Sequence, residues 1–312
     1  MLTRSISLCI AAFALTAVAA DVPKRKIAML PGPPSHGFGC HEHKAGLMLL
    51  ARLLNDNVPT VQATVIPEGW PKDPKALDGV SAIVIDCDGG SIIRQHLGEL
   101  DALMKKGVGL AVLHYATCVP KGKHGDAMLR WIGGYFETHW SVNPTWMADF
   151  KKLPEHPITR GVRPFRIRDE WYYHMRFVPD MKGVTPILTA VPPDSTRKRP
   201  DGPYSNNPTV RSRMGMPEHV AWAYERPDGG GRGFGYTGNH FHWNWAHDDV
   251  RTLVLNALVW IAGAEVPPGG VRTKTPTIAE LEANLDTPRP PGVSAQAIQR
   301  FIDDFKRPPR RK

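Results

Sequence analysis

Cysteine is scarce in this sequence. Only four of the 312 residues are cysteine, and one of them, Cys9, lies in an apolar N-terminal segment. The three others, Cys40, Cys87 and Cys118, allow at most one disulfide bond, so a hydrophobic core has to stabilise the fold. The hydrophobic fraction of 42% and the charged fraction of 22% are close to those of average soluble proteins, which argues against a disordered chain and against a multi-pass membrane protein.

Three motifs of well-known enzyme classes are also absent. No G-x-G-x-x-G follows the first predicted strand, so no nucleotide cofactor is expected. No G-x-C-x-G or G-x-S-x-G follows the fourth predicted strand, where residues 112–118 read VLHYATC, so nucleophilic cysteine or serine chemistry is not indicated. The histidines do not form H-E-x-x-H, and a zincin-type metalloprotease is therefore not implied.

The first twenty residues are predicted to be a cleavable signal peptide. Arg4 supplies a positive charge, residues 6–20 are almost continuously apolar, and small residues at 17–20 satisfy the rule for signal peptidase. The apolar run is too short to span a hydrocarbon core of ~30 Å, so no stable membrane insertion is expected. We expect export to the periplasm or beyond the cell.

The net charge of the chain is +9, and removal of residues 1–20 takes away Arg4 and no acid, which leaves +8. Part of this excess lies in a basic tail over the last twelve residues. Such a tail can contact nucleic acid, but an exported protein rarely meets any. We therefore expect no nucleic-acid partner.

Strands and helices alternate in the first ~120 residues of the chain, as in a parallel sheet with right-handed crossovers. The predicted strands are residues 26–30, 61–66, 80–85 and 108–113, and the predicted helices are 45–54 and 92–106. The third and fourth strands are almost entirely apolar, which is typical of strands covered on both faces. After an irregular stretch over 136–217, residues 219–225 and 233–236 are predicted to form a hairpin, and the apolar helix 250–261 closes the sheet.

Two regions of different composition follow the predicted signal peptide. We expect an α/β domain over residues 21–266 and a proline-rich, basic extension with short helices over residues 267–312. Thr277 and Glu280 form a capping box ahead of one short helix. Ile298, Phe301, Ile302 and Phe305 are spaced i, i+3, i+4, i+7, which predicts an amphipathic helix that docks on its own domain rather than on a partner.

Histidines follow several of the predicted strands. His41 and His43 come after the first strand, His114 directly after the fourth, and His240 after the late hairpin strand. Because open parallel sheets bind ligands beyond the carboxyl ends of their strands, we expect these side chains to meet at one edge. Three imidazoles could supply the ligands of a catalytic, zinc-like divalent metal, and the sequence does not decide between His41 and His43.

Glu170 is the best candidate for a carboxylate that either binds the metal or transfers protons. With His114 and His240 it makes up the candidate catalytic set. A metal-free pocket, in which the histidines shuttle protons to a hydroxyl or ketone, is an equal alternative, since imidazole serves both as ligand and as base.

Further histidines and aromatic residues are candidates for substrate binding. Flat rings beside polar groups suit sugars, whose C–H bonds pack on a ring while their hydroxyls bond outward. The candidates that we select on this ground are His36, His139, Tyr172, His242 and Trp243.

Five segments in order resemble the ThuA family (trehalose-utilisation-type proteins) of the class I glutamine amidotransferase-like superfamily. The matching segments are SHGFGCHEHKA at 35–45, GVGLAVLH at 107–114, IGGYFETH at 132–139, HPITRG at 156–161 followed by DEWY at 169–172, and GGRGFGYTGNH at 230–240. The resemblance implies a flavodoxin-like three-layer α/β sandwich with a mostly parallel central sheet. It further implies that the amidotransferase cysteine is absent and that His114 stands at the elbow region.

The same resemblance implies a role in carbohydrate metabolism, in pathways where a partner sugar dehydrogenase oxidises disaccharides to 3-keto forms. Our first hypothesis is an exported enzyme acting on a keto-sugar or disaccharide, in which a divalent metal assists isomerisation, elimination or hydrolysis. The alternative is a non-catalytic sugar-binding protein on the same scaffold. A working glutamine amidotransferase is a third hypothesis, which the missing elbow cysteine argues against.

Overall fold

The computed structural model describes residues 23–306; the predicted signal peptide at 1–20 lies outside the described residues, as do residues 21–22 and the last six. The first half of the chain contains, in order, β1 (Arg25–Pro31), α1 (His43–Asn57), β2 (Val61–Val65), β3 (Ala82–Asp86), α2 (Ser91–Gln95), α3 (Leu97–Lys105), β4 (Gly109–Leu113), α4 (Lys123–Ile132), β5 (Gly134–Tyr135) and β6 (Trp146–Phe150). The second half contains β7 (Phe165–Asp169), β8 (Arg176–Phe177), β9 (Val184–Ala190), α5 (Pro208–Arg211), β10 (Glu218–Glu225), β11 (Arg232–Tyr236), α6 (Asp248–Ile261), α7 (Ile278–Glu282) and α8 (Ala295–Lys306).

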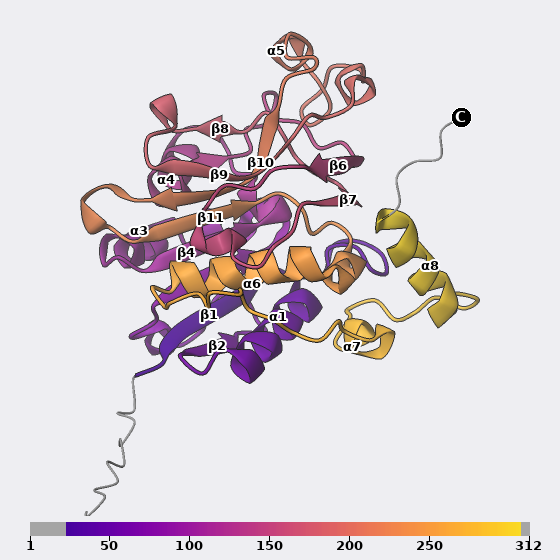
Figure 1. The fold of residues 1–312 in the computed structure, drawn as a ribbon. Helices are drawn as coiled ribbons and strands as arrows, with labels where there is room; N and C mark the ends of the chain where they lie inside the picture. Colours follow the sequence, from indigo (N-terminus) through magenta and orange to yellow (C-terminus); the bar gives the residue numbers. More distant parts are fainter. Residues whose placement is uncertain (1–22, 307–312) are drawn as a thin grey trace, which may run out of the picture.

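A seven-stranded sheet forms the centre of the molecule (Figure 1). Its strand order is β2-β1-β3-β4-β11-β10-β9. The strands β2, β1, β3, β4 and β11 run parallel, whereas β10 pairs antiparallel with both β11 and β9. The sheet is therefore mostly parallel, and its parallel strands bring their carboxyl ends to one edge.

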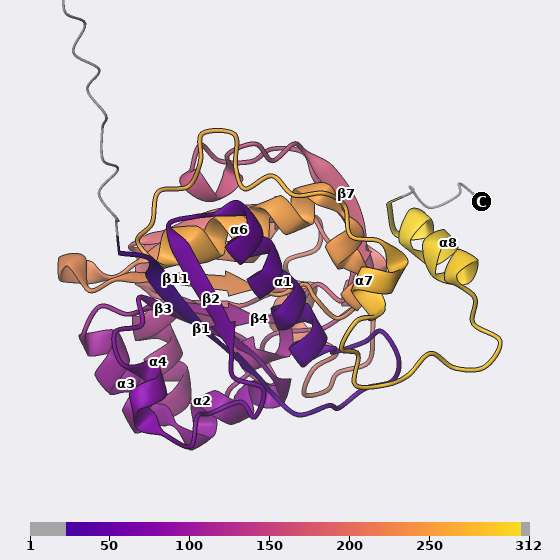
Figure 2. The same ribbon diagram turned by 90° about the horizontal axis from the view of Figure 1, so that it is seen from below.

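Helices cover both faces of this sheet (Figure 2). On one face α1 and α6 contribute to a large apolar cluster, and on the other α2, α3 and α4 contribute to a second cluster. Every residue of β3 and β4 is buried, because each of these strands is covered on both sides. This is the predicted three-layer sandwich.

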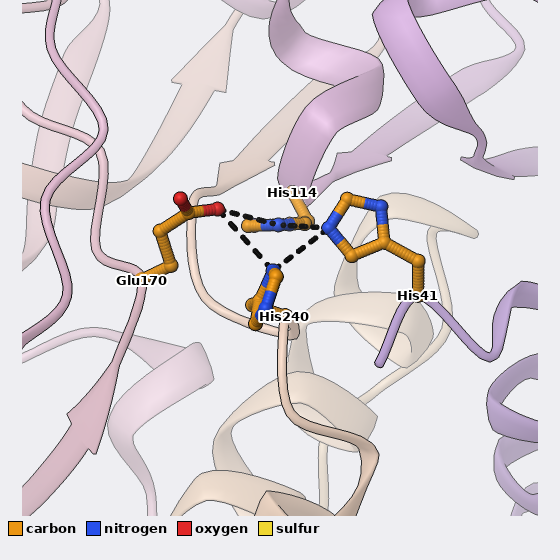
Figure 3. Close-up of side chains that lie close together, drawn as sticks. All are labelled: His41, His114, Glu170 and His240. Atoms are coloured by element: carbon orange, nitrogen blue, oxygen red, sulfur yellow. Dashed lines mark hydrogen bonds and ion pairs between the residues drawn. The ribbon is translucent and has the colours of Figure 1, made fainter. Parts of the chain in front are cut away.

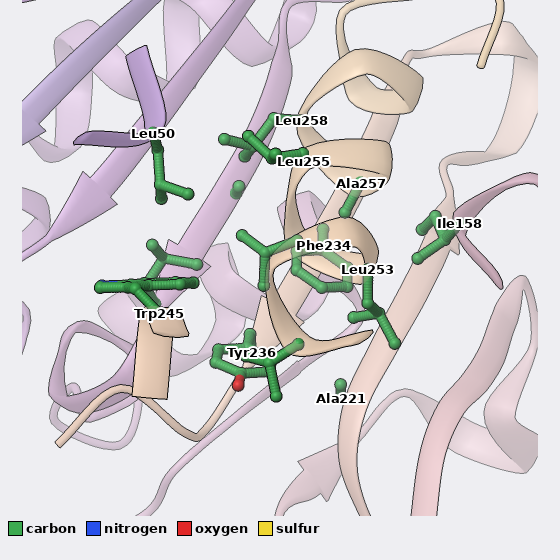
Figure 4. Close-up of a cluster of buried hydrophobic side chains, with 14 of the residues drawn as sticks. Leu50, Ile158, Ala221, Phe234, Tyr236, Trp245, Leu253, Leu255, Ala257 and Leu258 are labelled. Carbon is green, nitrogen blue, oxygen red and sulfur yellow. The ribbon is translucent and has the colours of Figure 1, made fainter. Parts of the chain in front are cut away.

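The first cluster is dense around α6 (Figure 4). Leu253, Leu255 and Leu258 of this helix are fully buried with Phe234 of β11 and Trp245. The end of α6 approaches β4 so closely that a Cβ added at Gly109 would lie 2.0 Å from the carbonyl oxygen of Ile261. Glycine is therefore required at that position by a close approach of two backbones.

The predicted strands and both apolar helices are present, with small shifts at their ends. The hairpin of residues 219–225 and 233–236 is formed by β10 and β11. The single helix predicted over 92–106 is instead divided into α2 and α3 at His96, whose backbone is non-helical and whose ring stacks on Trp70 at a centroid distance of 4.2 Å. The irregular middle contains two small antiparallel sheets, β5-β8 and β6-β7, that the sequence pattern does not single out.

The C-terminal extension packs on the α/β domain as far as the structure describes it. The capping box predicted at Thr277 and Glu280 is present at the start of α7. Leu281 of α7 is fully buried, and Ile298, Ile302 and Phe305 of α8 are nearly so and belong to the same apolar cluster as α6. The predicted docking of the last helix on its own domain is thus observed.

Within residues 23–306 the three cysteines, Cys40, Cys87 and Cys118, are free thiols. In the same part of the chain no helix is both long and apolar enough to cross a membrane.

Candidate functional site

Four side chains from separate segments meet beyond the carboxyl ends of the strands (Figure 3). His41 lies in the loop after β1, His114 directly after β4, Glu170 directly after β7, and His240 in the loop after β11. The Nε2 atom of His41 is 2.8 Å from Nδ1 of His240 and 3.1 Å from Nε2 of His114. The Oε2 atom of Glu170 is 3.5 Å from Nε2 of His114 and 3.3 Å from Nδ1 of His240. We call these residues the three-histidine–glutamate cluster.

The backbone is strained where the cluster residues are presented. His114 has a φ of 47° immediately after β4, and His41 has a φ of 49°. Asn239, next to His240, has a φ of 90°. Non-glycine residues with positive φ cost of order 1–3 kcal/mol each, and such strain clusters at functional sites. The turn at His114 has the character of a strand-to-helix elbow, since the strand passes directly into a 3₁₀ turn over His114–Thr117.

Three members of the cluster have a second partner that orients them. Nδ1 of His114 is 2.8 Å from the carbonyl oxygen of Thr237, to which it donates. Nδ1 of His41 is 2.7 Å from Oδ1 of Asp88, and the amide of Asn143 donates to Oε1 of Glu170 at 3.2 Å. A proton held on Nδ1 by an outer acceptor leaves Nε2 with a free lone pair, so His41 and His114 both present a lone pair to the centre of the cluster.

Burial and charge pairing set the protonation of these groups. Burial lowers the pKa of His41 to about 3, so its imidazole is neutral at physiological pH. Burial by itself would raise the pKa of Glu170, but the neighbouring imidazoles of His114 and His240 outweigh it and lower the pKa to about 2. Burial would lower the pKa of His240, but bonds with Cys40 and Glu170 raise it to about 10. Glu170 and His240 are therefore an ion pair, and a bound cation would displace the imidazole proton.

Asp169 holds the loop that carries His240 and was not among the residues selected from the sequence. Its side chain is fully buried. The carboxylate accepts hydrogen bonds from the backbone N–H groups of Glu170, Asn239, His240 and Phe241 and from the side-chain amide of Asn244. The sequence carries one signal for it, the pair of adjacent acidic residues that opens DEWY at 169–172, of which only Glu170 was selected.

The family model described as ThuA, trehalose utilisation, matches residues 34–261, which is most of the chain. The chain belongs to the ThuA family. The matched region contains all four residues of the three-histidine–glutamate cluster.

Several solved structures are similar to this ThuA chain. A ThuA-like protein from Bacteroides uniformis matches with a TM-score of 0.52 at 15% identity, covering 83% of this chain and 99% of that one. A ThuA-like protein from Parabacteroides merdae has a TM-score of 0.47 at 15% identity, with coverages of 78% and 91%. A glutamine amidotransferase from Thermotoga maritima has a TM-score of 0.41 at 9% identity, with coverages of 77% and 99%. No curated protein matches the chain. The predicted family and fold class are confirmed.

The structure separates the two histidines that the sequence left open. His41 belongs to the cluster, whereas Nε2 of His43 faces the carboxylates behind it, 3.3 Å from Oδ1 of Asp88 and 3.9 Å from Oδ1 of Asp86. His43 and Asp86 are both buried, and opposite charge nearby offsets the cost of burying either one. His43 thus supports Asp88, which in turn orients His41.

Of the candidates for substrate binding, two lie at the cluster. The ring of His36 stacks on that of His41 at a centroid distance of 3.6 Å and is largely exposed. The buried hydroxyl of Tyr172 is 3.1 Å from Nε2 of His114. These two side chains therefore adjoin the cluster, one from the solvent side and one from the core.

The other three candidates lie elsewhere. His139 is exposed and is not part of the cluster. His242 is buried, and its Nε2 donates to the carbonyl oxygen of Leu281 in α7 at 2.7 Å. The ring of Trp243 packs on Phe38 and closely over Gly39. Although they follow His240 closely in the sequence, His242 and Trp243 contact other parts of the fold.

Two cysteines of this ThuA chain, Cys87 and Cys118, are poorly suited to nucleophilic chemistry. Burial raises the pKa of both Cys87 and Cys118 to about 12, so neither thiol ionises at neutral pH. The elbow after β4 carries His114 in place of a nucleophile.

The cluster has the donor set of a divalent metal site. Three imidazole nitrogens and one carboxylate oxygen are ligands that zinc and similar borderline ions accept. Ligands at about 2.0–2.1 Å from a tetrahedral ion lie about 3.4 Å from one another. The four ligand-atom distances given above, between 2.8 and 3.5 Å, are close to that value.

Proposed function

We propose that this ThuA-family protein is an exported enzyme of carbohydrate metabolism that acts on a keto-sugar or a disaccharide. Its active site is the three-histidine–glutamate cluster, with a divalent, zinc-like metal bound by His41, His114, Glu170 and His240. The observation that carries the proposal is the convergence of these four ligand atoms from four separate segments. Buried histidines rarely converge in this way without a function, because gathering buried polar groups has an energetic cost.

Second partners on three of the ligands support a metal rather than a metal-free proton relay. Bound metal sites orient their histidines through outer carboxylates and carbonyls, as Asp88 and Thr237 do for His41 and His114. When bound, a metal would supply Lewis acidity to polarise a carbonyl or hydroxyl oxygen of the sugar.

The side chains around the cluster suit a neutral, hydroxyl-rich substrate. His36 offers an exposed imidazole that can bind a hydroxyl or move a proton to it, and Ser35 holds Nδ1 of this ring at 2.8 Å. Tyr115 presents a half-buried ring beside His41 and can pack on a sugar face. The hydroxyl of Tyr172 supplies a buried hydrogen-bonding group at His114.

The family description and the predicted signal peptide support the proposed substrate class and the proposed location of the protein. The family description, trehalose utilisation, favours a sugar substrate. The predicted signal peptide at 1–20 favours export. A 3-keto-glycoside would have to be supplied by a partner sugar dehydrogenase, which makes such an enzyme the expected functional partner.

The proposal is tested on purified mature protein in two steps. Elemental analysis should find about one divalent metal per chain, and a panel of 3-keto-glycosides and their parent disaccharides should include a substrate that is turned over. His114→Ala and Glu170→Gln should lose both metal and turnover. His124→Ala, which removes a partly exposed histidine of α4, is the matched control and should keep both.

Two outcomes would refute the proposed enzyme. Wild-type protein that takes up no divalent metal would exclude the metal site. Turnover of a confirmed substrate by His114→Ala at the wild-type rate would exclude the cluster as the active site. Glycan binding that survives both variants, without turnover by the wild type, would instead establish a sugar-binding protein.

A further inference from the structure

We infer that the C-terminal extension is part of the functional site: residues 267–306 hold the loops that carry the ligands and so set the affinity of the cluster for its metal. This inference rests on the proposed metal site. We call residues 267–306 the C-terminal clamp. The family model ends at residue 261, so the clamp lies beyond the region that defines the family.

The two loops that the clamp contacts are paired to each other at the cluster. The loop over residues 39–42 and the loop over 238–242 are joined by a bridge between Cys40 and Phe241. The N–H of His41 donates to the carbonyl oxygen of His240 at 3.1 Å, and the N–H of His242 donates to that of Gly39 at 3.0 Å. A displacement of either loop therefore moves both His41 and His240.

The first contact of the clamp is with the loop that carries His41. The backbone N–H of Asp286 donates to Oε2 of Glu42 at 2.9 Å, and Oε1 of Glu42 accepts from the N–H of Gly39 at 3.0 Å. Asp286 also forms an ion pair with Lys44 in the first turn of α1. Glu42 is nearly fully buried and directly follows His41. The clamp therefore holds the chain directly after this ligand and, through Glu42, the chain before it.

The second contact is with the loop that carries His240. In α7 the carbonyl oxygen of Leu281 accepts from the buried Nε2 of His242 at 2.7 Å. In α8 the ring of Phe305 packs on Phe241 at a centroid distance of 4.8 Å, and Phe241 packs in turn on the ring of His240 at 4.6 Å. Phe241 thus lies between the clamp and a metal ligand.

The third contact reaches the strand that ends at Glu170. The guanidinium of Arg168 lies over the ring of Phe305, 5.8 Å from its centroid. Helix α8 contacts both β7 and the 3₁₀ turn over His242–Ala246. In Figure 1 α7 and α8 lie together at one side of the molecule, next to the ends of β7 and α6. The clamp therefore touches the segments of three ligands, His41, Glu170 and His240.

These contacts give a physical reason for an extension beyond the family domain to affect metal affinity. Metal sites lose affinity when ligands are held loosely, because productive geometry is needed within about 0.5 Å. Apart from the single bridge between Cys40 and Phe241, the loops are irregular and belong to no sheet. Outer contacts of ligands typically contribute 10–100-fold to metal affinity.

The test uses Co²⁺ as the probe, because its visible spectrum reports on ligand geometry. Phe305→Ala removes the packing on Phe241, and Glu42→Gln weakens the acceptor for Gly39 and Asp286. The matched control is Phe177→Ala, which removes a half-buried phenylalanine that packs on Trp222 at 5.1 Å. Each protein is titrated with Co²⁺ in its full mature form, and its melting temperature is measured in parallel.

We expect Phe305→Ala and Glu42→Gln to bind Co²⁺ about tenfold or more weakly than the wild type, with an altered spectrum. Phe177→Ala should lower the melting temperature and leave Co²⁺ affinity and spectrum unchanged. Wild-type affinity and spectrum in both Phe305→Ala and Glu42→Gln would overturn the clamp and leave the metal site standing. Failure of the wild type itself to bind Co²⁺ would overturn the metal site, and the clamp with it.

Discussion

Replacement of Asp169 by asparagine tests whether a buried carboxylate outside the ligand set organises the site. Its Oδ1 atom accepts from the N–H groups of Glu170, His240 and Phe241 at 2.8, 3.2 and 3.4 Å. Its Oδ2 atom accepts from the N–H of Asn239 at 2.8 Å and the amide of Asn244 at 2.9 Å. An asparagine would place an NH₂ group in one of these two positions.

The cost follows from counting the donors that lose an acceptor. If the NH₂ group takes the Oδ2 position, the two donors that bonded there lose their acceptor. If it takes the Oδ1 position, the three donors that bonded there lose theirs. A buried donor without an acceptor costs about 1–3 kcal/mol, so Asp169→Asn should lower the free energy of unfolding by about 2–6 kcal/mol. This is a large fraction of the 5–15 kcal/mol that is typical of a folded protein.

The assay is denaturant unfolding at neutral pH, followed by titration of the folded variant with Co²⁺. The matched control is Asp149→Asn in β6, the partner strand of β7. Asp149 is partly exposed and pairs with Arg166 at 3.6 Å, so its replacement should change stability by less than about 0.5 kcal/mol. If Asp169→Asn were as stable as Asp149→Asn and bound Co²⁺ like the wild type, Asp169 would have no role in holding the His240 loop.

Two further predictions concern the outer ligand of His41 and the stability of the protein in acid. Asp88→Asn should weaken metal binding about 10–100-fold, because it replaces the carboxylate that accepts from Nδ1 of His41 by a neutral amide, which is a weaker acceptor; metal affinity equal to that of the wild type would contradict the assigned orientation of this imidazole. Burial lowers the pKa of His174 to about 4, so the native state keeps this imidazole neutral while the unfolded chain binds a proton below about pH 6.5. The free energy of unfolding should therefore fall as the pH is lowered from about 6.5 to 4, by up to about 3 kcal/mol from this residue. Asparagine tolerates the φ of 60° at this position, so His174→Asn should fold, and its free energy of unfolding should depend less on pH over that range. If urea titrations gave His174→Asn the same pH dependence as the wild type, His174 would not be the source of the effect.

The sequence carries much of the information about the fold because the relevant patterns are local. The almost uninterrupted apolar residues of β3 and β4 predict strands covered on both faces, and both faces are covered. The capping box at Thr277 and the apolar spacing of Ile298, Ile302 and Phe305 likewise predict helices that the structure contains. The division of the helix at His96 was not predictable, because it depends on stacking with Trp70 from a distant loop.

The positions of histidines at strand ends were visible in the sequence, since the carboxyl ends of parallel strands share one edge. Which ring points inward was decided by tertiary structure alone. His41 and His43 have the same chemistry and lie two residues apart, yet a positive φ at His41 turns one ring to the cluster and leaves the other against Asp86 and Asp88. Composition and periodicity thus determined the layers and the edge at which a site would form, whereas long-range contacts that no local pattern encodes, such as those of Asp169 and of the C-terminal clamp, determined how its side chains are held.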